Sequence, residues 1–433
     1  MKGSTGGTDA GGGTDMAGGT DPVGVTGVSG GTEIALRRKL PWIALLYFAQ
    51  GFPFGVIYDL LPVYFRTAGV SLREIGLLSL LGLPWSLKVF WSPIVDRFGD
   101  RRTWSSLCLL GMGGILLILP IFPSGSLGWG VRGLLLMFTV LSATQDIAID
   151  AYTIGLVRRG EEGVANSLRV SAYRAAIIGM GGGLVALSAV ASWPMLLRIA
   201  AVTALLLAIV VRMAPCVAVP LEARRDFFGP LWTWMRRSSA PAIFLFILLF
   251  KVGDASMAPM VKPFWLDRGL TPAEVGLIST TLGMLMTVLG AIIGGIFVTR
   301  VGIFRGLWVL GALQAVSNLG YAGVAWLGLP RPFVYAASVF ESLTGGMGSA
   351  AFLSFLMNIC EREHAAVEYA LLSAIFGLSR SVAGGFSGWA TEGLGYGDYF
   401  GVTFLLAIPA FVLLPWVRRW VRERSPVPAR RLS

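Results

Sequence analysis

Charged residues are scarce in this chain, and their scarcity limits the classes of protein it can belong to. Only 14% of the 433 residues are charged, 55% are hydrophobic, and the mean hydropathy is +0.72. Ordinary soluble domains carry about 25% charged residues. The composition therefore excludes an ordinary soluble protein and predicts a polytopic membrane protein.

Cysteine and histidine are also rare. Cys108, Cys216 and Cys360 show no paired spacing, so we expect neither a disulfide framework nor a metal site, and no cofactor. His364 is the single histidine, and it falls in a loop between two apolar runs. With no nucleophile and base at a recognisable spacing, a membrane enzyme is disfavoured.

Long apolar runs dominate what is present. A helix needs roughly 20 apolar residues to cross about 30 Å of hydrocarbon. The alternating pattern of a transmembrane barrel is absent from the sequence. We therefore expect an all-α protein with twelve transmembrane helices, at 41–65, 72–95, 104–122, 131–157, 163–190, 193–212, 240–265, 272–298, 305–327, 332–359, 366–391 and 398–417.

Basic residues set the expected orientation. The segments on the side of the two termini hold 22 Lys and Arg residues, and the opposite loops hold 6, namely Arg66, Arg73, Arg132, Lys262, Arg268 and Arg331. By the positive-inside rule, both termini lie in the cytoplasm and the protein spans the inner membrane several times. Anionic lipid headgroups explain the net charge of +11 without nucleic acid.

The ends and the middle of the chain differ from the spans. Residues 1–36 are rich in Gly and Thr and are expected to be a disordered tail. The apolar run after Lys39 is too long for a cleavable signal peptide. We expect six-helix halves at 37–212 and 240–417, a basic cytoplasmic linker at 213–239 and a basic tail at 418–433.

An internal duplication supports the two halves. The segment VYFRTAGVSLREIGLLS (63–79) recurs as PFWLDRGLTPAEVGLIS (263–279), which aligns Gly69 with Gly269 and Glu74 with Glu274 at an offset of 200 residues. Two halves of the same orientation are what a parallel repeat about the membrane normal predicts. This is the architecture of the major facilitator superfamily.

A charged turn between the second and third spans resembles the cytoplasmic gate signature of that superfamily. The turn reads SPIVDRFGDRR, and its counterpart in the second half reads TRVGIFR. A loop that only fixes topology would look similar, but the duplication favours the gate. The expected gate residues are Asp96, Arg97, Gly99, Arg101, Arg102, Arg300 and Arg305.

Two carboxylates interrupt the apolar run 134–157. Asp146 and Asp150 are four residues apart and share one helical face. If spans four and five form a hairpin, Asp150 lies level with Arg169, and Asp146 lies level with Arg174. Lys88 in span two is at a similar depth. Unpaired charges in lipid are costly, so we expect a charged cluster inside the first half.

The second half has a smaller set of intramembrane charges. Glu341 and Arg380 are expected at one level, Lys251 and Asp254 can pair at i and i+3, and Asp59 lies nearer the opposite end of span one. Such pairs can simply hold helices together. Their convergence at comparable depths in both halves favours a polar cavity between the halves.

Several strings resemble the AmpG-type muropeptide permeases, in the peptide/acetyl-coenzyme-A transporter branch of the major facilitator superfamily. They are QGFPFG (50–55), FWSPIVDR (90–97), SATQDIAIDA (142–151), AYR (172–174), ESLTGGMGSAAF (341–352) and YALLSAIFGLSRSVAGGFSG (369–388). The resemblance implies proton-driven import of N-acetylglucosaminyl-anhydromuramyl peptides. It places the family's Asp-x-x-x-Asp pair on Asp146 and Asp150, and its tyrosine-arginine step on Tyr173 and Arg174. The family's glutamate before the Gly-Met-Gly run falls on Glu341. Glu368 stands where relatives usually carry Gln.

These residues fit an anionic sugar-peptide chemically. Arg174, Lys251 and Arg380 could bind its carboxylates, with Gln50, Trp85 and Tyr173 as further contacts. Because no histidine lies inside the spans, proton coupling must use a carboxylate, and Asp146 is the first candidate. Other readings are a carrier of acetyl-coenzyme A, a small peptide or another anion, and a non-transporting membrane sensor. We expect a monomer whose partners are the solute, protons and the lipid bilayer.

The orientation can be tested with introduced cysteines. Cysteines at Ser124 and Gly395 should react with an impermeant thiol reagent added outside intact cells, and one at Ser425 should not, because the basic segments retain that side in the cytoplasm. Labelling at position 425 in intact cells would contradict the topology.

Overall fold

The structure, a computed structural model, describes residues 36–97, 100–157, 161–216, 235–236, 239–360 and 365–422. All regular elements in these ranges are helical, which confirms the predicted all-α class. Residues 1–35 of the expected N-terminal tail, most of the basic linker, and the basic tail after residue 422 lie outside the described residues, while residues 418–422 continue the last helix.

The first half is formed by six crossings of the bundle. Apart from the second crossing, its elements are α1 (Leu36–Gly55), η1 (Val56–Leu60), α2 (Leu61–Thr67), α6 (Arg101–Ile118), η4 (Leu119–Ile121), α7 (Trp129–Leu156), α8 (Glu162–Ala176), η5 (Ile177–Gly183), α9 (Leu184–Ala186), η6 (Leu187–Ala189) and α10 (Trp193–Arg212). Several of these elements follow one another without a loop, so α1, η1 and α2 form a single crossing.

The second crossing is a chain of short helical segments. They are α3 (Leu72–Leu77), η2 (Leu78–Gly82), α4 (Leu83–Leu87), η3 (Lys88–Phe90) and α5 (Ser92–Arg97). Pro84 and Pro93 each remove a backbone donor, and Gly82, two residues before Pro84, weakens the helix there. The described residues therefore contain eleven long apolar helices, and the span predicted at 72–95 is the broken one.

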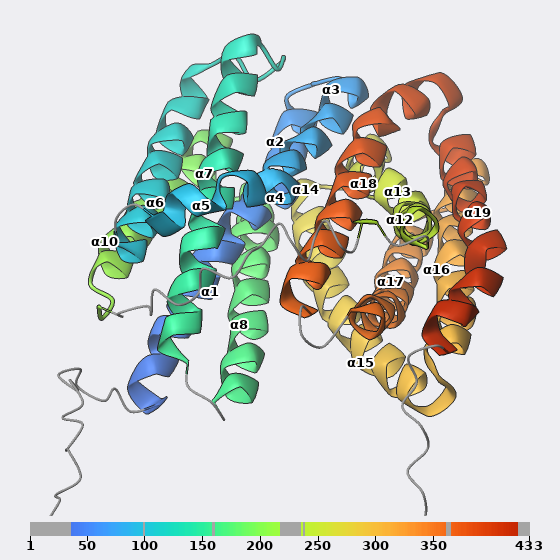
Figure 1. Ribbon diagram of the computed structural model, residues 1–433. Helices are drawn as coiled ribbons and strands as arrows, with labels where there is room; N and C mark the ends of the chain where they lie inside the picture. The colour runs from blue at the N-terminus through green and yellow to red at the C-terminus, as the bar shows by residue number, and fades with distance from the viewer. Residues whose placement is uncertain are drawn as a thin grey trace, which may run out of the picture. The chain divides into compact units, whose positions relative to one another are not determined.

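The second half repeats the arrangement. Its elements are α12 (Ala240–Phe250), α13 (Val252–Asp267), α14 (Pro272–Glu274), η8 (Val275–Leu282), α15 (Gly283–Val301), α16 (Ile303–Trp326), α17 (Arg331–Ile359), α18 (Ala365–Leu394) and α19 (Tyr396–Arg422). We call the end where α1 begins and α19 ends the terminal end, which is at the bottom of Figure 1. The opposite end, with the turns after α2 and α13, is the distal end.

The turns after α2 and α13 confirm the duplication in three dimensions. Gly69 and Gly269 both adopt a positive φ, +86° and +76°, which L side chains rarely adopt. The next residue closes the turn in the same way in both: Val70 N donates to Phe65 O at 3.0 Å, and Leu270 N donates to Trp265 O at 3.1 Å. The repeated sequence thus encodes a repeated backbone conformation.

The helix starts that follow these turns are also equivalent. The Ser71 and Thr271 hydroxyls accept from the backbone N of Glu74 and Glu274, at 3.3 and 3.2 Å. Each glutamate also forms an ion pair with an arginine at the start of a later helix of its own half. Arg132 of α7 lies 3.0 Å from Glu74, and Arg331 of α17 lies 3.4 Å from Glu274. These contacts tie the distal loops of each half to one another.

The halves meet closely in their distal part. Glycines allow backbones to touch: a Cβ at Gly76 would lie 2.7 Å from Gly388 N, and one at Gly182 would lie 2.7 Å from Gly276 O. Two ion pairs at the distal rim add to this contact, Arg66–Asp267 at 2.5 Å and Arg73–Glu392 at 2.5 Å. The structure therefore represents a state closed at the distal end.

The repeated turn gives a stability prediction. Gly269→Ala should lower the free energy of unfolding by about 1–2 kcal/mol, because alanine is strained at positive φ. Gly393→Ala is the matched control, since that glycine is helical and a Cβ there meets no atom within 4 Å. Thermal unfolding of the two detergent-purified variants tests this, and equal transition temperatures would contradict it.

Candidate functional site

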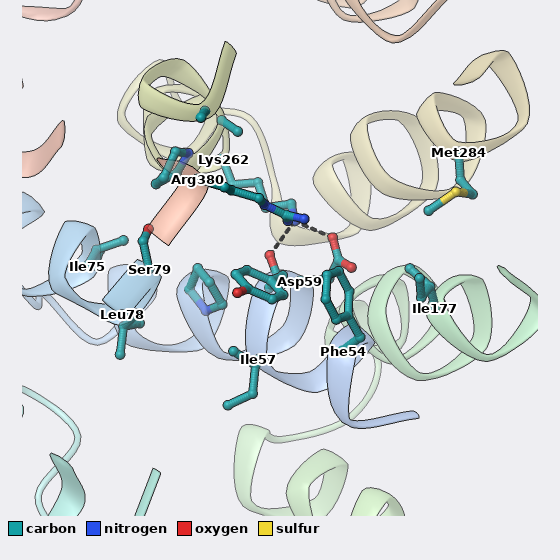
Figure 2. A pocket seen from close by; sticks show the side chains of 15 residues that line it. Phe54, Ile57, Asp59, Ile75, Leu78, Ser79, Ile177, Lys262, Met284 and Arg380 are labelled. Carbon is teal, nitrogen blue, oxygen red and sulfur yellow. Dashed lines mark hydrogen bonds and ion pairs between the residues drawn. The ribbon is translucent and has the colours of Figure 1, made fainter. Parts of the chain in front are cut away.

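A cavity of about 220 Å³ lies between the two halves (Figure 2). The first half contributes residues of α1, η1, α2, α3, η2 and η5, and the second contributes residues of α13, α15 and α18. The lining residues are Phe54, Ile57, Tyr58, Asp59, Pro62, Ile75, Leu78, Ser79, Ile177, Ala255, Ala258, Pro259, Lys262, Met284 and Arg380. This is the position where the sequence predicted a polar cavity.

An aromatic wall carries one of the predicted arginines. The guanidinium carbon of Arg380 lies 4.7 Å from the ring centre of Tyr58 and 5.2 Å from that of Phe54. The Trp85 ring packs behind them, 5.5 Å from Phe54 and 5.9 Å from Tyr58. Among the ion pairs between described residues, none involves Arg380, so its charge is available to an anionic ligand.

Arg174 and Tyr173 approach the same cavity from α8. Arg174 Nη1 lies 3.3 Å from the sulfur of Met284, which lines the cavity from the other half. The Tyr173 ring is 6.0 Å from Phe54. A thioether is a weak acceptor, so Arg174 retains most of its capacity to bind a carboxylate.

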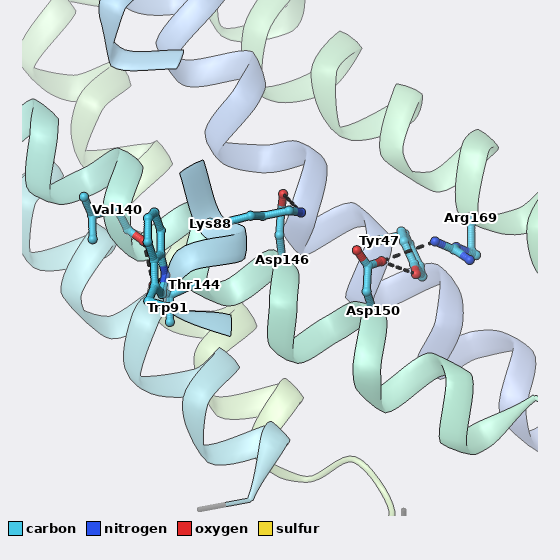
Figure 3. A network of polar contacts seen from close by, with 8 residues as sticks. All are labelled: Tyr47, Lys88, Trp91, Val140, Thr144, Asp146, Asp150 and Arg169. Carbon is cyan, nitrogen blue, oxygen red and sulfur yellow. Dashed lines mark hydrogen bonds and ion pairs between the residues drawn. The ribbon is translucent and has the colours of Figure 1, made fainter. Parts of the chain in front are cut away.

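Figure 3 shows the charged cluster of the first half. Lys88 Nζ lies 3.4 Å from Asp146 Oδ2, and Arg169 Nη2 lies 3.2 Å from Asp150 Oδ1. The Tyr47 hydroxyl donates to the same Asp150 oxygen at 2.8 Å, and the Arg169 guanidinium lies 4.4 Å over the Tyr47 ring. The predicted Asp150–Arg169 pair is present.

Two of the expected pairings are replaced by others. Asp146 pairs with Lys88, while Arg174 contacts Met284. Arg380 lies over the aromatic rings, and Glu341 accepts from Ser342 at 3.3 Å. Equal depth in a hairpin fixes height along the membrane but not the direction around the helix axis, so residues at one level can point apart.

Asp146 is the most enclosed carboxylate of the first cluster. It is 8% exposed, and its Oδ1 is buried with no hydrogen-bond partner in the described part of the chain. Gln50 lies within reach of this carboxylate, and its own Oε1 is likewise buried without a partner there. The site thus has spare acceptor capacity beside a single lysine.

Lys251 is placed away from the cavity. It lies at the break between α12 and α13, is 5% exposed, and donates to Gln314 Oε1 at 2.5 Å and Asp254 Oδ2 at 3.3 Å. Its predicted pairing with Asp254 is present. These contacts are internal to the second half, and Lys251 does not line the cavity in this state, so its role as a substrate ligand stays a prediction.

The expected gate residues are only partly described. Arg102 pairs with Asp100 at 2.8 Å and donates to Ala214 O at 2.7 Å, which fixes the start of α6. The Asp96 side chain and Gly99 lie outside the described residues. Arg97, Arg300 and Arg305 are exposed and Arg101 is half-buried.

Lys262 is the main residue that the sequence misassigned. Counting basic residues placed it in a loop, but it belongs to α13, lines the cavity and pairs with Asp59 of the other half. Its position three residues before the aromatic Trp265, inside an apolar run, was the available signal.

In the described residues, no group of three or more His, Cys, Asp or Glu could hold a metal ion.

Comparisons with known proteins agree with this architecture. Residues 40–127 match a family model described as acetyl-coenzyme A transporter 1. The chain is 32% identical over 392 residues to the anhydromuropeptide permease of Escherichia coli (strain K12), covering 86% of this chain and 78% of that protein. It is 27% identical over 416 residues to the putative transporter AmpG 4 of Rickettsia conorii, covering 89% and 98%.

Solved structures show the same fold. A bacterial homologue of the human lysosomal transporter Spinster, in an inward-facing and occupied conformation, superposes with a TM-score of 0.74 at 14% identity, covering 92% of this chain and 100% of that one. The nucleoside transporter NupG gives a TM-score of 0.66 at 16% identity, covering 88% and 98%. With this fold, and with the identity to the Escherichia coli protein over most of its length, the chain belongs to the AmpG-type family of anhydromuropeptide permeases in the major facilitator superfamily.

Proposed function

We propose that this protein is a secondary active transporter that imports anhydromuropeptides across the inner membrane by alternating access. The observation that carries the proposal is the cavity between the halves, where the Arg380 cation lies on an aromatic wall and has no ion-pair partner among the described residues. A site of this kind accommodates a ligand that has both flat apolar faces and negative charge.

The proposed substrate has these features. An N-acetylglucosaminyl-anhydromuramyl peptide carries sugar rings, which can pack on Phe54 and Tyr58, with Trp85 supporting these two rings from behind. Its peptide carboxylates suit guanidinium groups, which bind them with two parallel hydrogen bonds. Arg380 from the second half and Arg174 from the first half are the proposed carboxylate ligands, with Tyr173 beside them.

The direction of transport follows from the expected topology. With both termini in the cytoplasm, the distal end faces the periplasm, and the described state is closed on that side. Import is proposed to end in a state of this kind, with the distal side closed and the solute leaving toward the cytoplasm. The unit proposed to do this is a monomer.

A carboxylate of the first cluster is proposed to carry the coupled proton. Asp146 has one lysine partner and one unpaired oxygen, so its charge is compensated only while Lys88 stays in contact. When a conformational change moves Lys88 away, the enclosed acid is more stable with a proton. Asp150 has two partners, Arg169 and Tyr47, and is the second candidate.

A carrier of acetyl-coenzyme A is the alternative with a specific observation behind it, because the family model that matches residues 40–127 has that description. Coenzyme-A esters are anionic and would also bind Arg380. The muropeptide is favoured because the permease relative matches 86% of the chain, whereas the family model matches 88 residues. A sensor that transports nothing would give no exchange of labelled for unlabelled solute.

The role of Arg380 can be tested by counterflow in proteoliposomes. Arg380→Ala should raise the KM for labelled muropeptide by about 10- to 100-fold, because a charged hydrogen bond contributes about 1.5–3 kcal/mol. Arg198→Ala, on an exposed arginine of α10, is the matched control and should leave the KM unchanged. Competition by muropeptide, free peptide and acetyl-coenzyme A ranks the solutes. Preference for the coenzyme-A ester would overturn the proposed substrate.

The coupling assignment has its own test. Asp146→Asn should abolish accumulation driven by a proton gradient and keep counterflow measurable, since a neutral side chain cannot exchange a proton. Arg174→Ala should remove both activities. The double variant Lys88→Gln with Asp146→Asn avoids leaving a buried lysine unpaired if the single variant is unstable. Normal accumulation by Asp146→Asn would exclude Asp146 as the coupling residue.

A further inference from the structure

One ion pair both joins the halves and lines the cavity (Figure 2). Lys262 of α13 donates to Asp59 Oδ1 of η1 and to the backbone oxygen of Tyr58, the latter at 2.6 Å. The Lys262 side chain is 15% exposed and that of Asp59 is 12% exposed. Neither partner is needed by the roles assigned above to Arg380, Arg174 and Asp146.

Asp59 is held by donors of the other half. Besides Lys262, the Thr280 hydroxyl of η8 donates to Asp59 Oδ1 at 3.3 Å. From its own half, η5 presents Gly181, where an added Cβ would lie 2.9 Å from Asp59 Oδ2. Three π-helical turns, η1, η5 and η8, thus converge on one carboxylate, and such turns occur frequently at functional sites.

The other inter-half ion pairs between described residues have a different setting. Arg66–Asp267 and Arg73–Glu392 lie at the distal rim, the Arg73 side chain is 57% exposed, and none of the four lines the cavity. A substrate inside the cavity can reach Lys262 and compete with Asp59. It cannot compete for the rim pairs in this way.

We propose that Lys262 is a ligand for a substrate carboxylate, and that Asp59 takes the place of that carboxylate in the state described here. This inference rests on the proposed function, because it takes the cavity as the substrate site. Lys262 then has two alternative anionic partners, one belonging to the protein and one to the solute.

A charge balance limits this exchange. In a closed cavity, a lysine that binds the substrate no longer neutralises Asp59, and an unpaired buried carboxylate is strongly unfavourable. The groups that donate to Asp59 are Lys262 and Thr280, while Arg380 lies over the rings of Phe54 and Tyr58. When the substrate binds Lys262, Asp59 keeps the Thr280 hydroxyl as a donor, so the substrate carboxylate must offset the loss of the Lys262–Asp59 ion pair.

The first test compares two probes in proteoliposome counterflow: labelled muropeptide, and the same muropeptide with its peptide carboxylates amidated. Lys262→Met keeps an apolar stem and removes the charge. It should raise the KM for the free-acid probe by about tenfold or more, as expected for losing a charged hydrogen bond, and leave the KM for the amidated probe unchanged. Lys262→Arg should retain the preference for the free acid.

The second test addresses the internal competitor. Asp59→Asn should keep counterflow and lower the KM for the free-acid probe, because the competing anion is gone. Arg73→Gln is the matched control, since it breaks an inter-half ion pair outside the cavity. It should leave the KM ratio of the two probes as in the unmodified protein.

The outcomes separate this inference from the proposed function. If the unmodified protein exchanges muropeptide but Lys262→Met keeps the same KM ratio, the inference is wrong and the proposed function stands. If the unmodified protein exchanges neither probe, the proposed function fails and the inference fails with it. Should Lys262→Met be too unstable to purify, the double variant Asp59→Asn with Lys262→Met removes both charges and is judged by the same ratio.

Discussion

A charged side chain inside a membrane protein requires an opposite charge, a polar neighbour or water, because hydrocarbon offers none of these. Each half of this protein meets the requirement mostly within itself. The first half pairs Lys88 with Asp146, and the second pairs Lys251 with Asp254. Two self-compensated halves can move relative to one another without exposing these charges to lipid. The charges that face the cavity between the halves are then the ones that respond to a solute.

The cavity shows how the requirement is met where a ligand must enter. Arg380 is compensated by the faces of Phe54 and Tyr58, which stabilise a cation more weakly than a carboxylate does. Lys262 is compensated by Asp59, a stronger partner that comes from the opposite half. In this state one cation is thus open to a ligand, and the other becomes open only when its internal partner is displaced.

The sequence predicted the depth of these residues in the membrane better than it predicted their interaction partners. Helical rise and hairpin geometry gave the Asp150–Arg169 and Lys251–Asp254 pairs. The contacts of Arg174 and Arg380 depend on rotation about the helix axis and on the second half, which no local pattern encodes. The repeat predicted equivalent turns at Gly69 and Gly269, whereas the broken second crossing and the inward position of Lys262 became visible only in the folded chain.

The glycine contacts between the halves have a kinetic consequence. Where Gly76 meets Gly388 and Gly182 meets Gly276, backbone lies against backbone, and the side chains that reach these points from the other half, Ser387, Thr280 and Thr281, are short. Surfaces of this kind separate without rotamer changes or repacking, unlike the close-packed interior of each half. The polar contacts across the distal part, such as Arg66–Asp267, then contribute a larger share of the activation barrier for rocking. Turnover in such a protein can be adjusted over a wide range by single substitutions at those contacts, while the packing of each half stays intact.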